Sequence, residues 1–168
     1  SRSPIYISSN LNATVEFTDG TTMGTNYLLE TSQSTKVINA KVTAENGVDT
    51  TNYVITIERA KSSNNFLGDL QSNAGTTTMT QVPDFANNKT SYEIEVPGTQ
   101  SSIDLYVKAE DPKALVKIEN MTDTPTDSLT FNTVLNNPGE STTIKFEVTA
   151  ENGAVLPYTV KVNRLKNT

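Results

Sequence analysis

The chain has 168 residues and carries 13 Lys plus Arg against 19 Asp plus Glu, which gives a formal net charge of -6. We therefore expect no nucleic-acid partner, because nucleic acids require a basic surface. We also expect no membrane insertion, because no apolar run approaches the roughly 20 residues that a spanning helix needs. The absence of Cys and His excludes disulfides, thiol nucleophiles, the usual zinc sites and His-based triads. The 27 Thr, 18 Asn and 14 Ser are typical of a protein rich in strands and turns.

A hexapeptide, Val-Thr-Ala-Glu-Asn-Gly, occurs twice, at residues 42–47 and 148–153. Each copy leads into a second shared pattern, a Tyr followed six residues later by an Arg, at residues 53–59 and 158–164. The period is 106 residues at the hexapeptide and 105 residues at the Arg. Because this period is far longer than the unit of a solenoid, each copy is expected to be a whole domain. The sequence therefore predicts two domains in tandem.

The first predicted domain, residues 1–60, contains only the later part of the repeat. Its residues 13–17 and 38–42 align with residues 114–118 and 144–148 of the second copy. About 45 residues from the front of the second copy have no counterpart in it, and their loss should remove two strands and expose a sheet edge. Three interpretations stay open. The chain begins inside a domain whose front half lies elsewhere, the first domain is a short variant, or a partner segment supplies the missing strands.

The second predicted domain, residues 61–168, begins within a short linker at residues 60–65. Its segments alternate apolar and polar residues, as strands with one buried and one wet face do. The seven predicted strands are 66–70, 92–96, 103–109, 114–118, 129–131, 144–148 and 158–162. Turn signals such as Pro97-Gly98 separate them. Strands of this number and spacing predict an all-β fold, a complete immunoglobulin-like antiparallel β-sandwich.

The repeated hexapeptide predicts a β-hairpin in each domain. Its Asn-Gly pair, at residues 46–47 and 152–153, supplies two residues that tolerate the positive φ required by a tight turn. The loop that follows is one residue longer in the first copy. We therefore expect the strands to keep their register while the turn absorbs the difference.

The landmarks of the second copy also resemble those of a known family. In order, the copy contains Phe66-Leu67-x-x-Leu70, Asp84-Phe85, Thr90-Ser91-Tyr92-x-Ile94-x-Val96-Pro97, Ala109-Glu110-Asp111-Pro112 and the hexapeptide with Tyr158-x-Val160-x-Val162-x-Arg164. Over about residues 64–164 this pattern is similar to the cadherin-like β-sandwich repeat of bacterial surface proteins. The resemblance implies an extracellular protein, attached to the cell surface or secreted. It also implies a spacer or interaction module that stands beside other domains of the same protein.

Acidic residues are the first candidates for a ligand site, because classical cadherins bridge their domains with calcium through clustered acidic motifs. The residues to compare are Asp104, Glu110, Asp111, Asp123 and Asp127. None of them has the spacing of a calcium loop, and Asp111 is expected to cap a turn through its side chain. The sequence therefore predicts no metal site and no cofactor.

Aromatic residues are the second candidates. Tyr53, Tyr92 and Tyr158 have apolar residues two positions away and are expected in the core, with each hydroxyl bonded to a neighbouring loop. Tyr106 falls out of phase with its apolar neighbours and should face solvent, and Tyr27 lies in a segment without a clear pattern.

The longest loop, residues 71–88, adds one more candidate. It carries Met79 between threonines, either as a contact or as part of an edge strand. The predicted binding residues are therefore Tyr106, Met79 and Tyr27.

The scattered carboxylates, without a nucleophile and its base, predict that the chain is not an enzyme. The first functional hypothesis is a structural spacer and interaction module of a multidomain bacterial surface or secreted protein. The alternative is an adhesin or glycan-recognition appendage that binds a host or cell-surface protein or a glycan through loops at one end of the sandwich. A third hypothesis is an assembly joint, in which a partner segment completes the first domain.

Overall fold

The computed structural model describes residues 12–20, 23, 24, 26, 27, 29 and 33–167. Every regular element within these residues is a β-strand, which confirms the predicted all-β class. The contacts between residues divide the chain into two units, Ser1–Lys61 and Ser62–Thr168. In the described part of the chain, no helix is long and apolar enough to cross a membrane.

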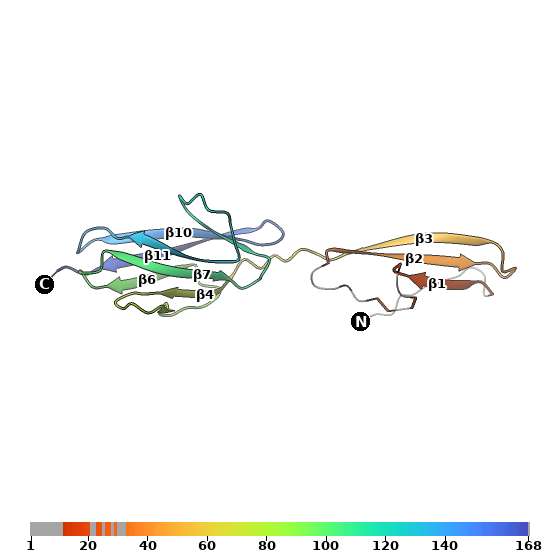
Figure 1. Cartoon of the computed structure of the whole chain (residues 1–168), viewed down its shortest axis with the longest axis horizontal. Coiled ribbons are helices and arrows are strands. Elements are labelled where there is room, and N and C mark those ends of the chain that lie inside the picture. The colour runs from red at the N-terminus through yellow and green to blue at the C-terminus, as the bar shows by residue number, and fades with distance from the viewer. Residues whose placement is uncertain (1–11, 21–22, 25, 28, 30–32, 168) are drawn as a thin grey trace. The chain divides into compact units, whose positions relative to one another are not determined.

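The second unit consists of two four-stranded sheets that face each other (Figure 1). One sheet has the order β6-β11-β10-β8, with bounds Ser91–Val96, Val155–Arg164, Ser141–Thr149 and Leu115–Ile118. The other has the order β5-β4-β7-β9, with bounds Thr80–Gln81, Leu67–Ser72, Ser102–Ala109 and Ser128–Val134. Each of the seven predicted strands overlaps one of these strands, and the predicted sandwich-like arrangement is present.

Two details of the second unit differ from the prediction. β5 is an eighth strand, and its two residues are too few to show an alternating pattern. β6 runs parallel to β11, with Tyr92 opposite Val160 and Ile94 opposite Val162, so the sandwich is not wholly antiparallel. Alternation shows which face of a strand is buried and carries no information about the direction of the neighbouring strand. The sequence pattern could not reveal this parallel pair for that reason.

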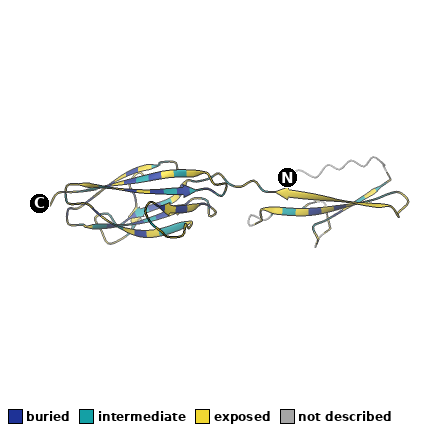
Figure 2. Cartoon of the chain, turned by 90° about the horizontal axis from the view of Figure 1, so that it is seen from above, coloured by how far each residue is buried: buried dark blue, intermediate teal, exposed yellow. Residues whose placement is uncertain are grey.

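The core of the second unit lies between its two sheets. Buried and exposed side chains alternate along its strands, as the dark blue and yellow bands show (Figure 2). The largest fully buried side chains include Tyr158, Leu67, Leu70, Ile103 and Leu105. Burying one side chain of this size contributes about 1.5–3 kcal/mol, so the core is what holds the two sheets together.

The first unit contains one described sheet, with the order β1-β2-β3 and bounds Thr14–Thr18, Thr35–Thr43 and Thr50–Glu58. Its three strands pair in the same register as β8, β10 and β11 of the second unit. Val15 lies opposite Val42 as Val116 lies opposite Val148, and nine residue pairs join both β2 to β3 and β10 to β11. Among the described residues of this unit, no second sheet faces β1-β2-β3. Its completion into a sandwich stays a prediction.

The two repeated hairpins keep the same register and differ in their turns, as expected. The last strand pairs are Thr43 with Thr50 and Thr149 with Val155, which leave loops of six and five residues. Only the Gly of each Asn-Gly pair has a positive φ, 70° at Gly47 and 91° at Gly153. The expectation that the Asn also takes this conformation is therefore wrong.

The Asn of each turn acts through its side chain instead. The Asn46 Oδ1 accepts the backbone N–H groups of Val48 and Asp49, at 3.0 and 3.1 Å. The Asn152 Oδ1 accepts the N–H of Ala154 at 2.9 Å. Such bonds stabilise a turn while the Asn keeps an ordinary backbone conformation.

Candidate functional site

Tyr106 lies on the outward face of β7, half-buried between two fully buried neighbours, as its phase predicts. Together with Asp69, Gln71 and Lys108 it lines an open, mainly polar depression over β4, β5 and β7. This depression presents hydrogen-bonding groups and a single aromatic ring to solvent. The binding role of Tyr106 stays a prediction.

Met79 and Tyr27 do not join this depression. Met79 is half-buried and lies immediately before the edge strand β5, outside its bounds. Tyr27 belongs to the first unit, where its ring packs against the small core of that sheet. Its hydroxyl accepts the N–H of Gly24 at 3.1 Å, and the Lys36 ammonium lies 5.9 Å from its ring centre. The structure thus gives Tyr27 a packing role in the first unit, and the predicted binding roles of both residues stay predictions.

Three of the five acidic candidates, Asp104, Glu110 and Asp111, accept hydrogen bonds from the protein itself. The two carboxylate oxygens of Asp104 accept the side-chain amides of Asn73 and Asn132, at 2.8 and 2.7 Å. The Asp111 carboxylate accepts the N–H of Lys113 at 2.9 Å, which confirms its predicted role as a turn cap. Within the described residues, no three His, Cys, Asp or Glu side chains gather in a way that could hold a metal ion.

The structure contradicts the prediction that Tyr53 lies in the core. Its repeat partner Tyr158 is 1% exposed and packs in the core, whereas Tyr53 is 55% exposed. The whole of β3 is exposed in the same way, including Ile55 and Ile57 (Figure 2). The reason lies outside the strand, because β11 has a facing sheet and a second neighbour, β6, and β3 has neither among the described residues. An identical local pattern thus gives a core strand in one unit and an exposed edge strand in the other.

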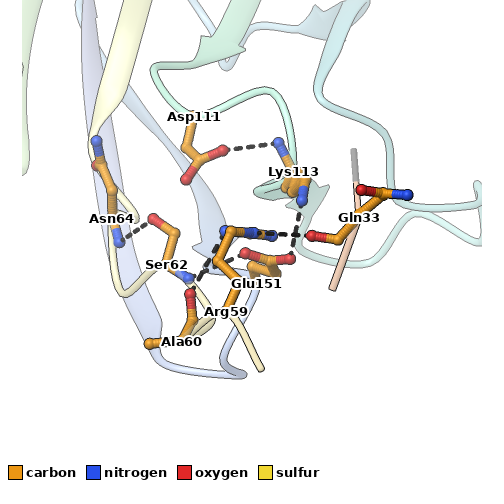
Figure 3. A network of polar contacts seen from close by, with 8 residues as sticks. All are labelled: Gln33, Arg59, Ala60, Ser62, Asn64, Asp111, Lys113 and Glu151. Atoms are coloured by element: carbon orange, nitrogen blue, oxygen red, sulfur yellow. Dashed lines mark hydrogen bonds and ion pairs between the residues drawn. The ribbon is translucent and has the colours of Figure 1, made fainter. Parts of the chain in front are cut away.

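The repeated hexapeptide of the second unit holds the segment that leads into its first strand. The Glu151 carboxylate accepts the N–H of Ser62 at 2.9 Å and the ammonium of Lys113 at 3.2 Å (Figure 3). The N–H of Asn152 donates to the Ser62 carbonyl at 3.0 Å. Four of the six residues of the predicted linker, from Ser62 to Asn65, therefore belong to the second unit.

Glu110 and Asn64 fasten the same segment to the body of the sandwich. The Asn64 amide donates to one Glu110 oxygen at 2.8 Å, and the Asn87 amide donates to the other at 3.2 Å. These hydrogen bonds, that of Asn64 foremost, hold the pKa of Glu110 below its ordinary value of 4.5. The pKa of Asp111 is lowered as well, first by a hydrogen bond from Ser62 and then by the backbone of Lys113.

Tyr158, a core residue, also contacts the segment that leads into β4. Its hydroxyl donates to the Asn65 carbonyl at 3.1 Å. Burial raises the pKa of Tyr158 to about 12, so the phenol stays protonated and keeps donating at every ordinary pH. A core side chain is therefore hydrogen-bonded directly to the segment that leads into β4. We call Ser62, Asn64, Glu110, Lys113, Glu151 and Tyr158 the docking end.

Removing Asn64 should raise the pKa of Glu110. In an Asn64→Ala variant we expect the Glu110 carboxyl to titrate closer to its ordinary value of 4.5, because its first hydrogen-bond donor is lost. A lowered folded-state pKa means that the carboxylate stabilises the fold above pH 4.5 and that this contribution is lost as the pH falls through the lowered pKa. Carboxyl-detected NMR titration measures the shift. Asn87→Ala is the matched control with a smaller rise, and an unchanged pKa in Asn64→Ala would contradict the assignment.

The sequence contains one signal for the docking end, in the repeated hexapeptide. A hairpin turn needs only the Asn-Gly of the hexapeptide. The Glu that precedes this pair is also repeated, so a role other than the turn is expected for it. Its contact with Ser62 spans 89 residues of sequence, and no local pattern indicates such a partner. The repeated Arg has a similar role, since Arg164 donates to the carbonyls of Gly98 and Asn136 at the other end of the unit.

The two facing sheets, the closed core and the absence of helices in the described residues define the class as a β-sandwich domain. A model of the cadherin-like beta sandwich domain matches residues 70–165. The chain belongs to this family, as its landmarks indicated. Domains of the family are typically extracellular and non-catalytic, and they serve as structural and interaction modules. A comparison with curated proteins found no match.

Proposed function

We propose that the chain is a non-catalytic module of a multidomain bacterial surface or secreted protein, and that Ser62–Thr168 serves as a spacer. The observation that supports this role is the position of the two ends of that unit. The segment before β4 enters at one end of the sandwich, and the C-terminus leaves at the other (Figure 1). The last strand, β11, runs between these ends for ten residues, or about 33 Å at ~3.3 Å per residue.

Both ends of this unit are tied to its body. The docking end holds Ser62 through Glu151 and Asn152. At the far end, β11 is paired on both sides, with six residues of β6 and nine residues of β10. A force that pulls the two ends apart would act along the strands. Many backbone hydrogen bonds of these strand pairs would then have to break at once.

Force spectroscopy on the full chain tests the spacer role. With attachment points at Ser63→Cys and Lys166→Cys, we expect the second unit to open in one step that adds about 330 Å, estimated from ~3.5 Å per extended residue and the ~33 Å folded length. The matched control is Ser63→Cys with Val155→Cys, which attaches both handles near the docking end and should open at lower force. Gradual extension, or equal forces in the two geometries, would refute a load-bearing spacer.

The first unit favours a second role, an assembly joint. Its sheet exposes four large apolar side chains along β3, of which Tyr53, Ile55 and Ile57 lie on one face and Val54 on the other. An exposed strand edge with an apolar face is a common site of strand addition. Light scattering and native mass spectrometry of the full chain, alone and with candidate partners, measure whether this unit associates.

A further inference from the structure

In the second unit β6 and a facing sheet cover the strand that corresponds to β3, and the described residues of the first unit include neither. The sheets β1-β2-β3 and β8-β10-β11 share one register. In the second unit the free edge of β11 is paired with β6, in parallel, over six residues. The corresponding edge of β3 has no partner strand among the described residues.

The exposed side chains of β3 correspond to side chains of β11 that lie between the two sheets of the second unit, beside β6 and under the facing sheet β5-β4-β7-β9. In β11 the inward residues Tyr158, Val160 and Val162 are at most 1% exposed. Their repeat positions in β3 are Tyr53, Ile55 and Ile57, all at least 40% exposed. Phe17, Ile38 and Ala40, on β1 and β2 of the same sheet, are buried. The exposed apolar side chains of this face therefore lie on the edge strand β3, beside which a β6-like strand would pair.

The register of β6 on β11 specifies how such a strand would lie. Tyr92, Ile94 and Val96 alternate along β6 and are all buried. Transferred by the repeat period of 105, the Tyr92 position falls opposite Ile55 and the Ile94 position opposite Ile57. An occupant therefore needs an extended segment with aromatic or β-branched residues at alternate positions, parallel to β3.

The polar face of β3 adds a charge preference. In the second unit, Glu93 of β6 is held by Lys161 and Asn163, at 3.1 and 2.6 Å. The repeat positions of these two partners are Thr56 and Glu58, so β3 offers no cation and one carboxylate in their place. An acidic residue at the Glu93 position would be repelled there, and a basic residue would be attracted.

We propose that β3 is an acceptor for a strand of another polypeptide that pairs parallel to it. This strand has aromatic or β-branched residues at alternate positions and a basic residue between them. The proposal rests on the assembly-joint role above and specifies its occupant, direction and register. It does not involve the spacer role of the second unit.

The first experiment uses the full chain and a fluorescent peptide of residues 88–98 that carries Glu93→Lys. We expect saturable binding by fluorescence anisotropy, about tenfold tighter than for the unaltered peptide, because one repulsion becomes an attraction. A peptide with Tyr92→Ser, Ile94→Ser and Val96→Ser should lose binding. In the chain, Ile55→Asp should weaken binding at least tenfold, while Val54→Asp, on the opposite face of β3, should change it less than about threefold.

Disulfide trapping tests direction and register, and the absence of native Cys makes it selective. A Thr56→Cys chain should couple fastest to a peptide with Glu93→Cys, because the equivalent pair, Lys161 and Glu93, lies side by side in the second unit. A peptide with Lys89→Cys should couple at least tenfold more slowly. Equal rates would overturn the proposed register.

The outcomes separate this proposal from the role on which it rests. If the chain instead forms a dimer that Ile55→Asp dissociates, and the peptide does not bind, the assembly joint stands and the proposed occupant is wrong. If the chain stays monomeric and no peptide binds, both are wrong. Peptide binding that is insensitive to Ile55→Asp would also overturn the proposal.

Discussion

Replacing Tyr158 with alanine is expected to lower the free energy of unfolding of the second unit by about 3–5 kcal/mol, the usual cost of removing a buried ring. The Tyr158 ring is stacked on that of Phe146, with centroids 5.4 Å apart and planes 6° from parallel. Its hydroxyl also bonds Asn65 at the docking end. The substitution therefore leaves a cavity in the core and frees the segment that leads into β4.

The matched control is Tyr53→Ala, the same substitution at the same position of the repeat. Because Tyr53 is 55% exposed, we expect this variant to change the stability of its unit by less than about 1 kcal/mol. Amide hydrogen exchange on the full chain resolves the two units and gives both values in one experiment. Equal losses would mean that Tyr53 is covered in solution.

Val160→Asp is expected to have the largest effect, the loss of folded structure in the second unit. Val160 is 0% exposed and lies opposite Ile144 on one side and Tyr92 on the other. A carboxylate placed there finds no cation and no donor, and a buried unpaired charge costs more than about 4–5 kcal/mol. That cost is comparable to the whole stability of many domains. Circular dichroism and amide exchange over Ser62–Thr168 should both show the loss.

Ile55→Asp places the same charge at the repeat position in β3. Ile55 is 42% exposed, so the carboxylate stays hydrated and the sheet should keep its exchange protection. The acceptor proposal also expects this variant to lose strand binding. Because the variant should stay folded, that loss can be attributed to the changed surface of β3. A folded Val160→Asp protein with unchanged protection would disprove the position of Val160 in the core.

Several features of the fold could be predicted because they depend on residues close in sequence. The alternation of Tyr92, Ile94 and Val96 shows which face of β6 is buried. The Asn-Gly of the hexapeptide marks the hairpin, and the one-residue difference between the copies falls in the turn. The Asp111 turn depends on a carboxylate and an N–H two residues apart.

The candidate site was less predictable, because its contacts are remote in sequence. Glu151 reaches Ser62 across 89 residues and Asn64 reaches Glu110 across 46 residues. Neither pair has a spacing rule that sequence analysis could apply. β5 has only two residues, which is too short for an alternating pattern. The side-chain pattern of β6 is the same whether the strand runs parallel or antiparallel to β11.

The sequence by itself determined the all-β class, the repeat, the hairpins and the family resemblance, because each follows from local periodicity or from ordered landmarks. Only the tertiary structure decided which copy of the pattern is buried. Tyr53 and Tyr158 stand in the same motif, and one is exposed while the other is in the core. Burial depends on what covers a strand, and in this protein the cover comes from β6 and a second sheet that the first unit lacks among its described residues.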